Sequence, residues 1–251
     1  MGLEEQALAS ILASLRVVPA IGFAQPFTSV RTPGIVRALL ALSIGAWLSV
    51  GSPPQVRLTA SPGLLASVAA IELIIGIALA LCLHAAFAAL LTIGRLMDIQ
   101  AGFGLAALVD PTTRAQLPLA GTVFLYAAGA LFFSGDGPAN LLALLSTSMT
   151  AMPIGSPVSL SPAALAALLS TCFTIACGIG GAIILALFLT DLAIAFMSRT
   201  LPQMNVMLLG FQVKAIVMLL LLPVSLSLSA SVIVRLLRTA FEMAPDLIGR
   251  A

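Results

Sequence analysis

Charged residues are scarce in this chain of 251 residues, of which 8% are charged and 61% are hydrophobic. Since a soluble domain carries about 25% charged residues, this composition excludes a water-facing globular surface, and the +2 net charge without any basic run excludes a nucleic-acid-binding surface. We therefore expect an all-α polytopic membrane protein whose exterior is covered by membrane lipid or by other proteins.

Six apolar segments follow one another along the chain. A helix needs about 20 apolar residues to cross the hydrocarbon core of a bilayer. The first segment is interrupted by Arg16 and Pro19, and the second carries Arg37 near its start. Glu4 and Glu5 stand where a secretory signal would carry positive charge, so we expect the first segment to be retained. The segments are residues 8–23, 35–50, 63–94, 117–133, 163–190 and 215–234.

Glycine and proline clusters mark the connections between these segments. Such clusters lie at residues 51–54, 135–138 and 152–157. Ser161 followed by Pro162 predicts the N-cap and first turn of the helix of the fifth segment.

Two connections, residues 95–116 and 199–214, differ from ordinary loops. Both are apolar for much of their length, yet both contain glycine, proline and polar residues. Irregular backbone at membrane depth is tolerated where it is buried in protein or lines a cavity. We expect the function of the chain to reside in these two stretches.

Glu72, His84 and Asp191 are the ionisable residues deepest in apolar sequence. A charge at the centre of a bilayer costs about 2.5–3.5 kcal/mol on insertion scales, so each should face the helix bundle or a partner. A proton or ion path and a paired structural role both remain open for them. Glu72 has no obvious partner within the sequence, whereas Arg95 and Asp98 are spaced to pair on one helix face.

No pattern typical of an enzyme is present. Gly102-Phe103-Gly104 is too short for a phosphate-binding loop and is not followed by lysine. There is no Ser/His/Asp set and no spacing typical of metal ligands, so we expect neither catalysis nor a cofactor.

The chain contains a series of short motifs in a fixed order. The most specific is Pro202-Gln203-x-Asn205, which is followed by Gly210-Phe211 and Lys214. The others are Ala85-Ala86-Phe87-Ala88-Ala89, Ile99-Gln100-Ala101-Gly102-Phe103-Gly104, Val109-Asp110-Pro111 and Met152-Pro153-Ile154-Gly155-Ser156. Together these motifs resemble the FliR family of flagellar biosynthetic export-gate proteins, whose injectisome counterpart is SctT. Gln212 is a departure, since many members of that family have proline there.

The resemblance implies a core membrane component of the flagellar type III export gate. It implies residues 1–160 as a FliP-like helical part with a plug loop near 101–117, and residues 161–251 as a FliQ-like helical hairpin with a C-terminal tail, in one integrated membrane unit. The resemblance implies that the protein is located in the bacterial inner membrane, within the flagellar basal body. The implied partners are FliP, FliQ and FlhB homologues, in a hetero-oligomer that conducts unfolded flagellar subunits.

The resemblance also assigns two groups of candidate site residues. The plug or gate would comprise Gly102, Phe103, Gly104, Leu105, Leu108, Asp110 and Pro111. The subunit interface would comprise Glu72, Asp191, Arg199, Pro202, Gln203, Asn205, Gly210, Phe211 and Lys214.

Two other interpretations remain open. An SctT-type protein of an injectisome is the nearer alternative, although the motifs at Val109-Asp110-Pro111 and Pro153-Ile154-Gly155-Ser156 favour the flagellum. A secondary transporter would also combine broken helices with charges at the midplane. The absence of a recognisable internal repeat argues against a transporter.

Overall fold

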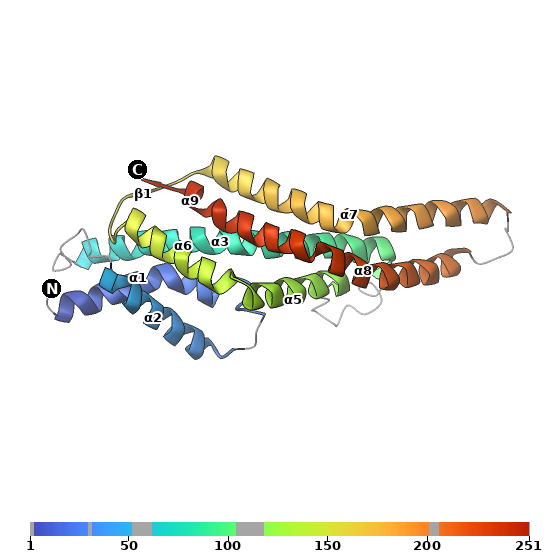
Figure 1. The fold of residues 1–251 in the computed structure, drawn as a ribbon. Helices are drawn as coiled ribbons and strands as arrows, with labels where there is room; N and C mark the ends of the chain where they lie inside the picture. Colours follow the sequence, from blue (N-terminus) through green and yellow to red (C-terminus); the bar gives the residue numbers. More distant parts are fainter. Residues whose placement is uncertain (1–2, 30–31, 52–61, 104–117, 201–205, 251) are drawn as a thin grey trace. The chain divides into compact units, whose positions relative to one another are not determined.

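The computed structural model describes residues 3–29, 32–51, 62–103, 118–200 and 206–250, and these ranges are almost entirely helical (Figure 1). The elements in chain order are α1 (Leu3–Gly22), α2 (Gly34–Gly51), α3 (Pro62–Ala101), α5 (Leu119–Ser134), α6 (Gly137–Ala151), β1 (Val158–Leu160), α7 (Pro162–Thr200), α8 (Val206–Glu242), α9 (Ala244–Leu247) and β2 (Ile248–Arg250). The expected all-α fold class is thus confirmed.

Fewer helices than expected are suited to cross a membrane. Within the described ranges, α3, α7 and α8 are long and apolar enough to span, and α5 and α6 together form a possible fourth, bent span. The first expected segment is not a candidate span, because α1 contains Arg16 and begins with acidic residues, which lower its hydropathy. The second is not a candidate span, because the apolar helix Gly34–Val50 is too short to cross a bilayer. The count of six spans is therefore not confirmed.

Helix α6 was not expected from the sequence. Hydroxyl and amide side chains dilute its apolar character, whereas Leu141, Leu145 and Met149 are buried and lie four residues apart along one face. This stripe, rather than overall hydropathy, makes it a helix. Gly135 and Asp136 separate it from α5, at the break that the glycine and proline cluster predicted.

The N-cap prediction for α7 is confirmed. The Ala164 N–H donates to the Ser161 hydroxyl over 3.2 Å, and Pro162 is the first helical residue. The side-chain oxygen thus satisfies one of the amides that a helix start leaves without an intrahelical partner.

The helices form two compact units, and α3, α5, α7 and α8 contribute residues to both. Unit 1 comprises Met1–Phe87, Phe132–Thr171 and Leu237–Ala251, and unit 2 comprises Ala88–Leu131 and Cys172–Leu236.

In unit 1, α1 lies against both α2 and α3 at glycine contacts (Figure 1). A Cβ at Gly45 would lie 2.6 Å from the Ser14 backbone, and one at Gly76 would collide with the Arg16 backbone. Only glycine allows backbones to approach so closely. Near the C-terminus, β2 pairs antiparallel with β1, with Ser159 opposite Gly249.

In unit 2, α3 is the helix on which the others pack. A Cβ at Gly94 would collide with the Gly121 backbone of α5, and Gly180 of α7 faces the side chains of Ile93 and Met97. The Ser225 hydroxyl of α8 donates to the Ile179 carbonyl of α7 over 3.3 Å. These contacts bring the last turns of α3 next to the α7–α8 hairpin.

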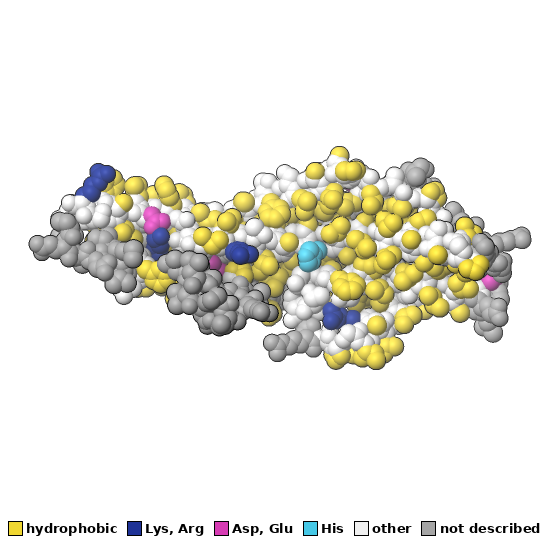
Figure 2. Space-filling model, turned by 180° about the vertical axis from the view of Figure 1, so that it is seen from behind, with side chains coloured by type: hydrophobic (Ala, Val, Ile, Leu, Met, Phe, Trp, Pro, Cys, Tyr) yellow, Lys and Arg dark blue, Asp and Glu magenta, His cyan; other side chains and the backbone are white. Residues whose placement is uncertain are grey.

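Large apolar side chains cover much of the surface, as the view in Figure 2 shows. They include Trp47 on α2, Leu185 and Phe188 on α7, and Leu220 and Leu228 on α8, all more than half exposed. A surface of this kind is stable in lipid or against other proteins.

Candidate functional site

Within unit 2, the end of α3 is joined to α7 and α8 by a cluster of three polar side chains. The Lys214 ammonium of α8 lies 2.5 Å from Asp191 Oδ1 of α7. Gln100 of α3 donates from Nε2 to Asp191 Oδ2 over 2.9 Å, and its carbonyl accepts from Lys214 Nζ at 3.3 Å. Asp191 and Lys214, both expected at a subunit interface, therefore have each other as partners.

Gly102 and Phe211 meet beside this cluster. Gly102 has φ +87°, and its N–H donates to the Ile99 carbonyl over 3.0 Å, which ends α3. A Cβ at Gly102 would lie 2.8 Å from Phe211 Cε2. A residue expected in the plug thus contacts a residue expected at the interface, and glycine is required for both conformation and space.

Asp98 has a different partner from the one expected. Its carboxylate accepts the Ala120 N–H at 3.2 Å through each oxygen and so caps the first turn of α5. Among the described residues no ion pair joins Arg95 to Asp98, so that i,i+3 expectation is wrong. Four amides without intrahelical partners at the start of α5 attract the carboxylate more than an exposed arginine does.

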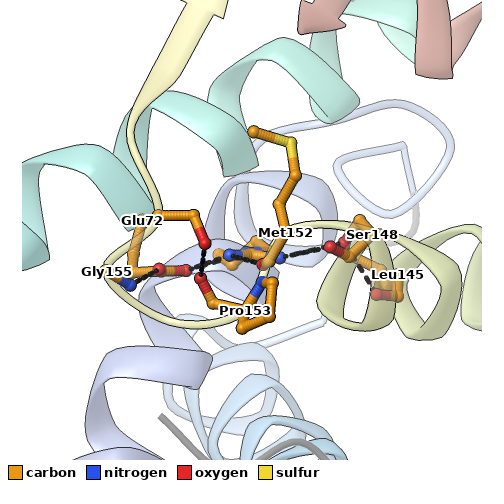
Figure 3. A network of polar contacts seen from close by, with 8 residues as sticks. Glu72, Leu145, Ser148, Met152, Pro153 and Gly155 are labelled. Atoms are coloured by element: carbon orange, nitrogen blue, oxygen red, sulfur yellow. Dashed lines mark hydrogen bonds and ion pairs between the residues drawn. The ribbon is translucent and has the colours of Figure 1, made fainter. Parts of the chain in front are cut away.

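Glu72 is paired within the chain, although the sequence offered it no obvious partner. The Arg16 Nη2 atom lies 2.7 Å from Glu72 Oε2, and both side chains are 0% exposed. Arg16 Nε donates to the same oxygen over 2.8 Å. The Gly155 N–H donates to Glu72 Oε1 over 3.2 Å (Figure 3).

The same guanidinium also binds the end of α6. Arg16 donates to the Ser148 carbonyl over 2.8 Å and to the Met152 carbonyl over 2.9 Å. The Ser148 carbonyl also accepts the Met152 N–H over 2.9 Å, and Met152 is the residue directly after α6. The negative end of the helix dipole favours a cation there. All three nitrogens of the guanidinium are thereby hydrogen-bonded, as a buried charge requires.

The motif at residues 152–156 is the turn that completes this network. Gly155 has φ +86°, and Ser156 donates to the Pro153 carbonyl through both its N–H and its hydroxyl, at 3.0 and 2.7 Å. The turn aims the Gly155 N–H at Glu72 (Figure 3).

The remaining interface candidates differ in exposure. Arg199 is exposed in the last turn of α7, and the Phe211 side chain is 38% exposed. Gly210 is buried inside α8, where an added Cβ would lie 3.3 Å from Ile194 Cδ1. His84 is exposed and lines an apolar cavity with Pro19 and Phe23.

Several candidate residues lie outside the described residues. These are Gly104, Leu105, Leu108, Asp110 and Pro111 of the expected plug, and Pro202, Gln203 and Asn205 of the expected interface. The connection expected over residues 199–214 is shorter in the structure, because α7 extends to Thr200 and α8 begins at Val206.

Sequence reasoning missed Arg16 and Gln100. Arg16 was treated as an interruption of an apolar segment, although a buried arginine needs an anionic partner and Glu72 was the acidic residue without one. Gln100 gave no such signal, because a glutamine near a helix end is ordinary. In the described ranges, no group of three or more His, Cys, Asp or Glu residues is placed to hold a metal ion.

Comparison with known proteins identifies the family. Residues 7–240 match the model of the bacterial export proteins, family 1. The chain is 27% identical to flagellar biosynthetic protein FliR of Bacillus subtilis (strain 168) over 216 residues, which cover 83% of this chain and 81% of that one. It is 29% identical to the FliR protein of Escherichia coli (strain K12), with 71% and 69% covered.

The similarity extends beyond flagellar proteins. The Yop proteins translocation protein T of Yersinia pestis is 28% identical over 158 residues, which cover 60% of this chain and 59% of that one. The chain belongs to the FliR family of bacterial export proteins.

Proposed function

We propose that this member of the FliR family is a core component of the flagellar type III protein export gate in the bacterial inner membrane. The observation that carries the proposal is the family match over residues 7–240, nearly the whole chain. Three relatives that bear the name FliR match 83%, 71% and 82% of this chain. The long apolar helices α3, α7 and α8 fit a membrane component.

The gate would form by assembly with FliP and FliQ homologues, joined by an FlhB homologue. Supporting this are the exposed apolar faces of α7 and α8, where Leu185, Phe188, Leu220 and Leu228 are all more than half exposed. Such faces need lipid or neighbouring helices. Within the assembly, residues 161–251 would act as a FliQ-like hairpin and residues 1–160 as a FliP-like part.

The hairpin bend would be the surface that faces neighbouring subunits and FlhB. Arg199 is exposed at the end of α7, and Phe211 is partly exposed near the start of α8. Pro202, Gln203 and Asn205 lie between these helices in the sequence. Asp191 and Lys214 contribute through their mutual ion pair, which holds the two helices together.

The segment from Gly102 to Leu117 would close the conduit, with Phe103, Leu105 and Leu108 as an apolar seal. Apolar side chains at a narrow constriction exclude water and so block ions without a fixed charge. The positive φ of Gly102 turns the chain away from the axis of α3 at the start of this segment. The role of the gate would be to conduct unfolded flagellar subunits.

Co-expression tests the assembly. The tagged chain is purified in mild detergent after expression with FliP and FliQ homologues from the same genome, and Gln203→Leu and Asn205→Leu variants are compared with it. Co-purification of all three proteins, weakened by the variants while membrane insertion persists, supports the proposal. A chain that purifies alone as a small homo-oligomer indicates a transporter instead.

The plug is tested by deleting residues 102–108. We expect the complex to assemble and to conduct small ions in planar bilayers, whereas the unmodified complex does not. If the assembled deletion complex conducts no more ions than the unmodified complex, the plug hypothesis is wrong. If the deletion abolishes assembly, the segment has a packing role instead.

An injectisome is the second candidate system, favoured by the similarity to Yop proteins translocation protein T. The genes next to the one encoding this chain distinguish the two systems. Neighbouring genes for hook, rod or filament proteins support the flagellum.

A further inference from the structure

We propose that Gln100, Asp191 and Lys214 form a releasable latch that fastens the end of α3 to the α7–α8 hairpin while the conduit is closed. The proposal rests on the proposed function in an export conduit, and it adds a positioning role for Gln100. The three side chains come from three helices and meet within unit 2.

The Asp191 carboxylate is the centre of the latch, because it binds both other side chains. Its Oδ1 atom forms an ion pair with Lys214 Nζ at 2.5 Å, and its Oδ2 atom accepts a hydrogen bond from Gln100 Nε2 at 2.9 Å. Lys214 also donates to the Gln100 carbonyl at 3.3 Å, so it binds the last turn of α3 through the backbone. Loss of Asp191 therefore removes both side-chain contacts at once.

The latch differs from the ion pair that joins α1 to α3. Arg16 and Glu72 are both 0% exposed, and the guanidinium is hydrogen-bonded through all its nitrogens. The Lys214 and Asp191 side chains are 21% and 37% exposed. Separation of the sealed pair would strand two buried charges, whereas separation of the accessible pair exposes its groups to water or to a competing partner. The first pair is therefore a fixed support and the second a contact that can open.

The latch lies next to Gly102, the first residue after α3. Gly102 follows Gln100 by two residues. The ring that packs against Gly102 belongs to Phe211 of α8, three residues before Lys214. A displacement of α8 relative to α3 would separate Lys214 from Gln100 and lift the Phe211 ring from Gly102 together. The latch thus couples the position of the hairpin to the point where the chain leaves α3.

The test introduces one pair of cysteines into the chain within the assembled complex. Cys82→Ala, Cys172→Ala and Cys177→Ser remove the native thiols, and Gln100→Cys with Asp191→Cys replaces the latch by two thiols. A short bifunctional methanethiosulfonate reagent links them, and a reductant cuts the link. Asp191→Cys and Gln100→Cys remove the ion pair with Lys214 and the side-chain hydrogen bond, and leave only the bond from Lys214 to the backbone carbonyl of residue 100. The unlinked complex should therefore leak ions several-fold more than its cysteine-free parent.

Linking should restore the barrier and stop export of flagellar subunits, and reduction should reverse both effects. The matched control is Asp191→Cys with Ala195→Cys, which takes the same reagent within α7 but leaves α3 free. That control should leak whether or not it is linked. A purely structural role predicts loss of assembly rather than this reversible gain and loss of conductance.

The proposal is overturned if the unlinked complex is as tight as its parent, if the linked complex still exports, or if the thiols of residues 100 and 191 fail to link. The yield of linked thiols reports the proximity of α3 and α7, so it can be measured even in a complex that does not export. Failure of the proposed function shows separately, as an unmodified chain that does not co-purify with the FliP and FliQ homologues.

Discussion

Arg16 and Glu72, which are 56 positions apart in the sequence, form a buried ion pair with Nη2 and Oε2 2.7 Å apart. The pair joins α1 to α3, and the further bonds of Arg16 join both helices to the end of α6. Unit 1 is therefore built around one neutralised charge pair rather than around apolar contacts alone.

Breaking this pair should destabilise unit 1 strongly. Glu72→Leu leaves a buried guanidinium without its counter-ion, at a cost of about 3–5 kcal/mol. Glu72→Gln keeps hydrogen-bonding capacity toward Arg16 and Gly155 and should lose less. The measurement is the midpoint of thermal unfolding of the chain in detergent. Glu242→Gln, which breaks the exposed Arg238–Glu242 pair, is the control and should have little effect.

Gly155→Ala should destabilise the turn that supplies an N–H to Glu72. The position has φ +86°, where a side chain costs about 1–2 kcal/mol. Gly178→Ala is the matched control, because a Cβ there meets nothing within 4 Å and alanine favours a helix by about 1 kcal/mol. Thermal unfolding should therefore shift in opposite directions for the two variants. A shift of the same sign for both would contradict the structural assignment.

Gly102→Ala should disturb the contact between α3 and α8. The new methyl group meets the Phe211 ring and the backbone is strained at φ +87°. Phe211→Ala should relieve the steric part of the defect but leave the strain. We expect the double variant to fall between Gly102→Ala and the unmodified chain in a thermal unfolding assay. Strict additivity of the two single effects would argue against the contact.

Asp98→Ala should weaken the start of α5. Loss of the cap on the Ala120 N–H is expected to cost about 0.5–2 kcal/mol. Arg95→Ala should cost much less, since Arg95 is exposed and forms no ion pair with Asp98 in the described residues. Equal losses for both variants would restore the i,i+3 pair expected from the sequence.

Composition and motif order were sufficient for the fold class and the family. Long apolar runs predict helices in any membrane protein, because the bilayer leaves the backbone no other hydrogen-bonding partner. Local signals were sufficient for the N-cap at Ser161 and the break at residues 135–136, since both depend on adjacent residues. The amphipathic helix α6 was not predicted from the sequence, because it is marked by a buried apolar stripe along one face rather than by high overall hydropathy.

Only the tertiary structure decided which charged and polar side chains pair. Arg16 with Glu72, and Gln100 with Asp191 at a separation of 91 positions, meet because glycine contacts such as those of Gly76 and Gly180 bring distant helices together. Pairing across such separations depends on helix rotation and register, which no local pattern encodes. For the same reason Asp98 was assigned to Arg95, its neighbour in sequence, rather than to the amide of Ala120, its neighbour in space.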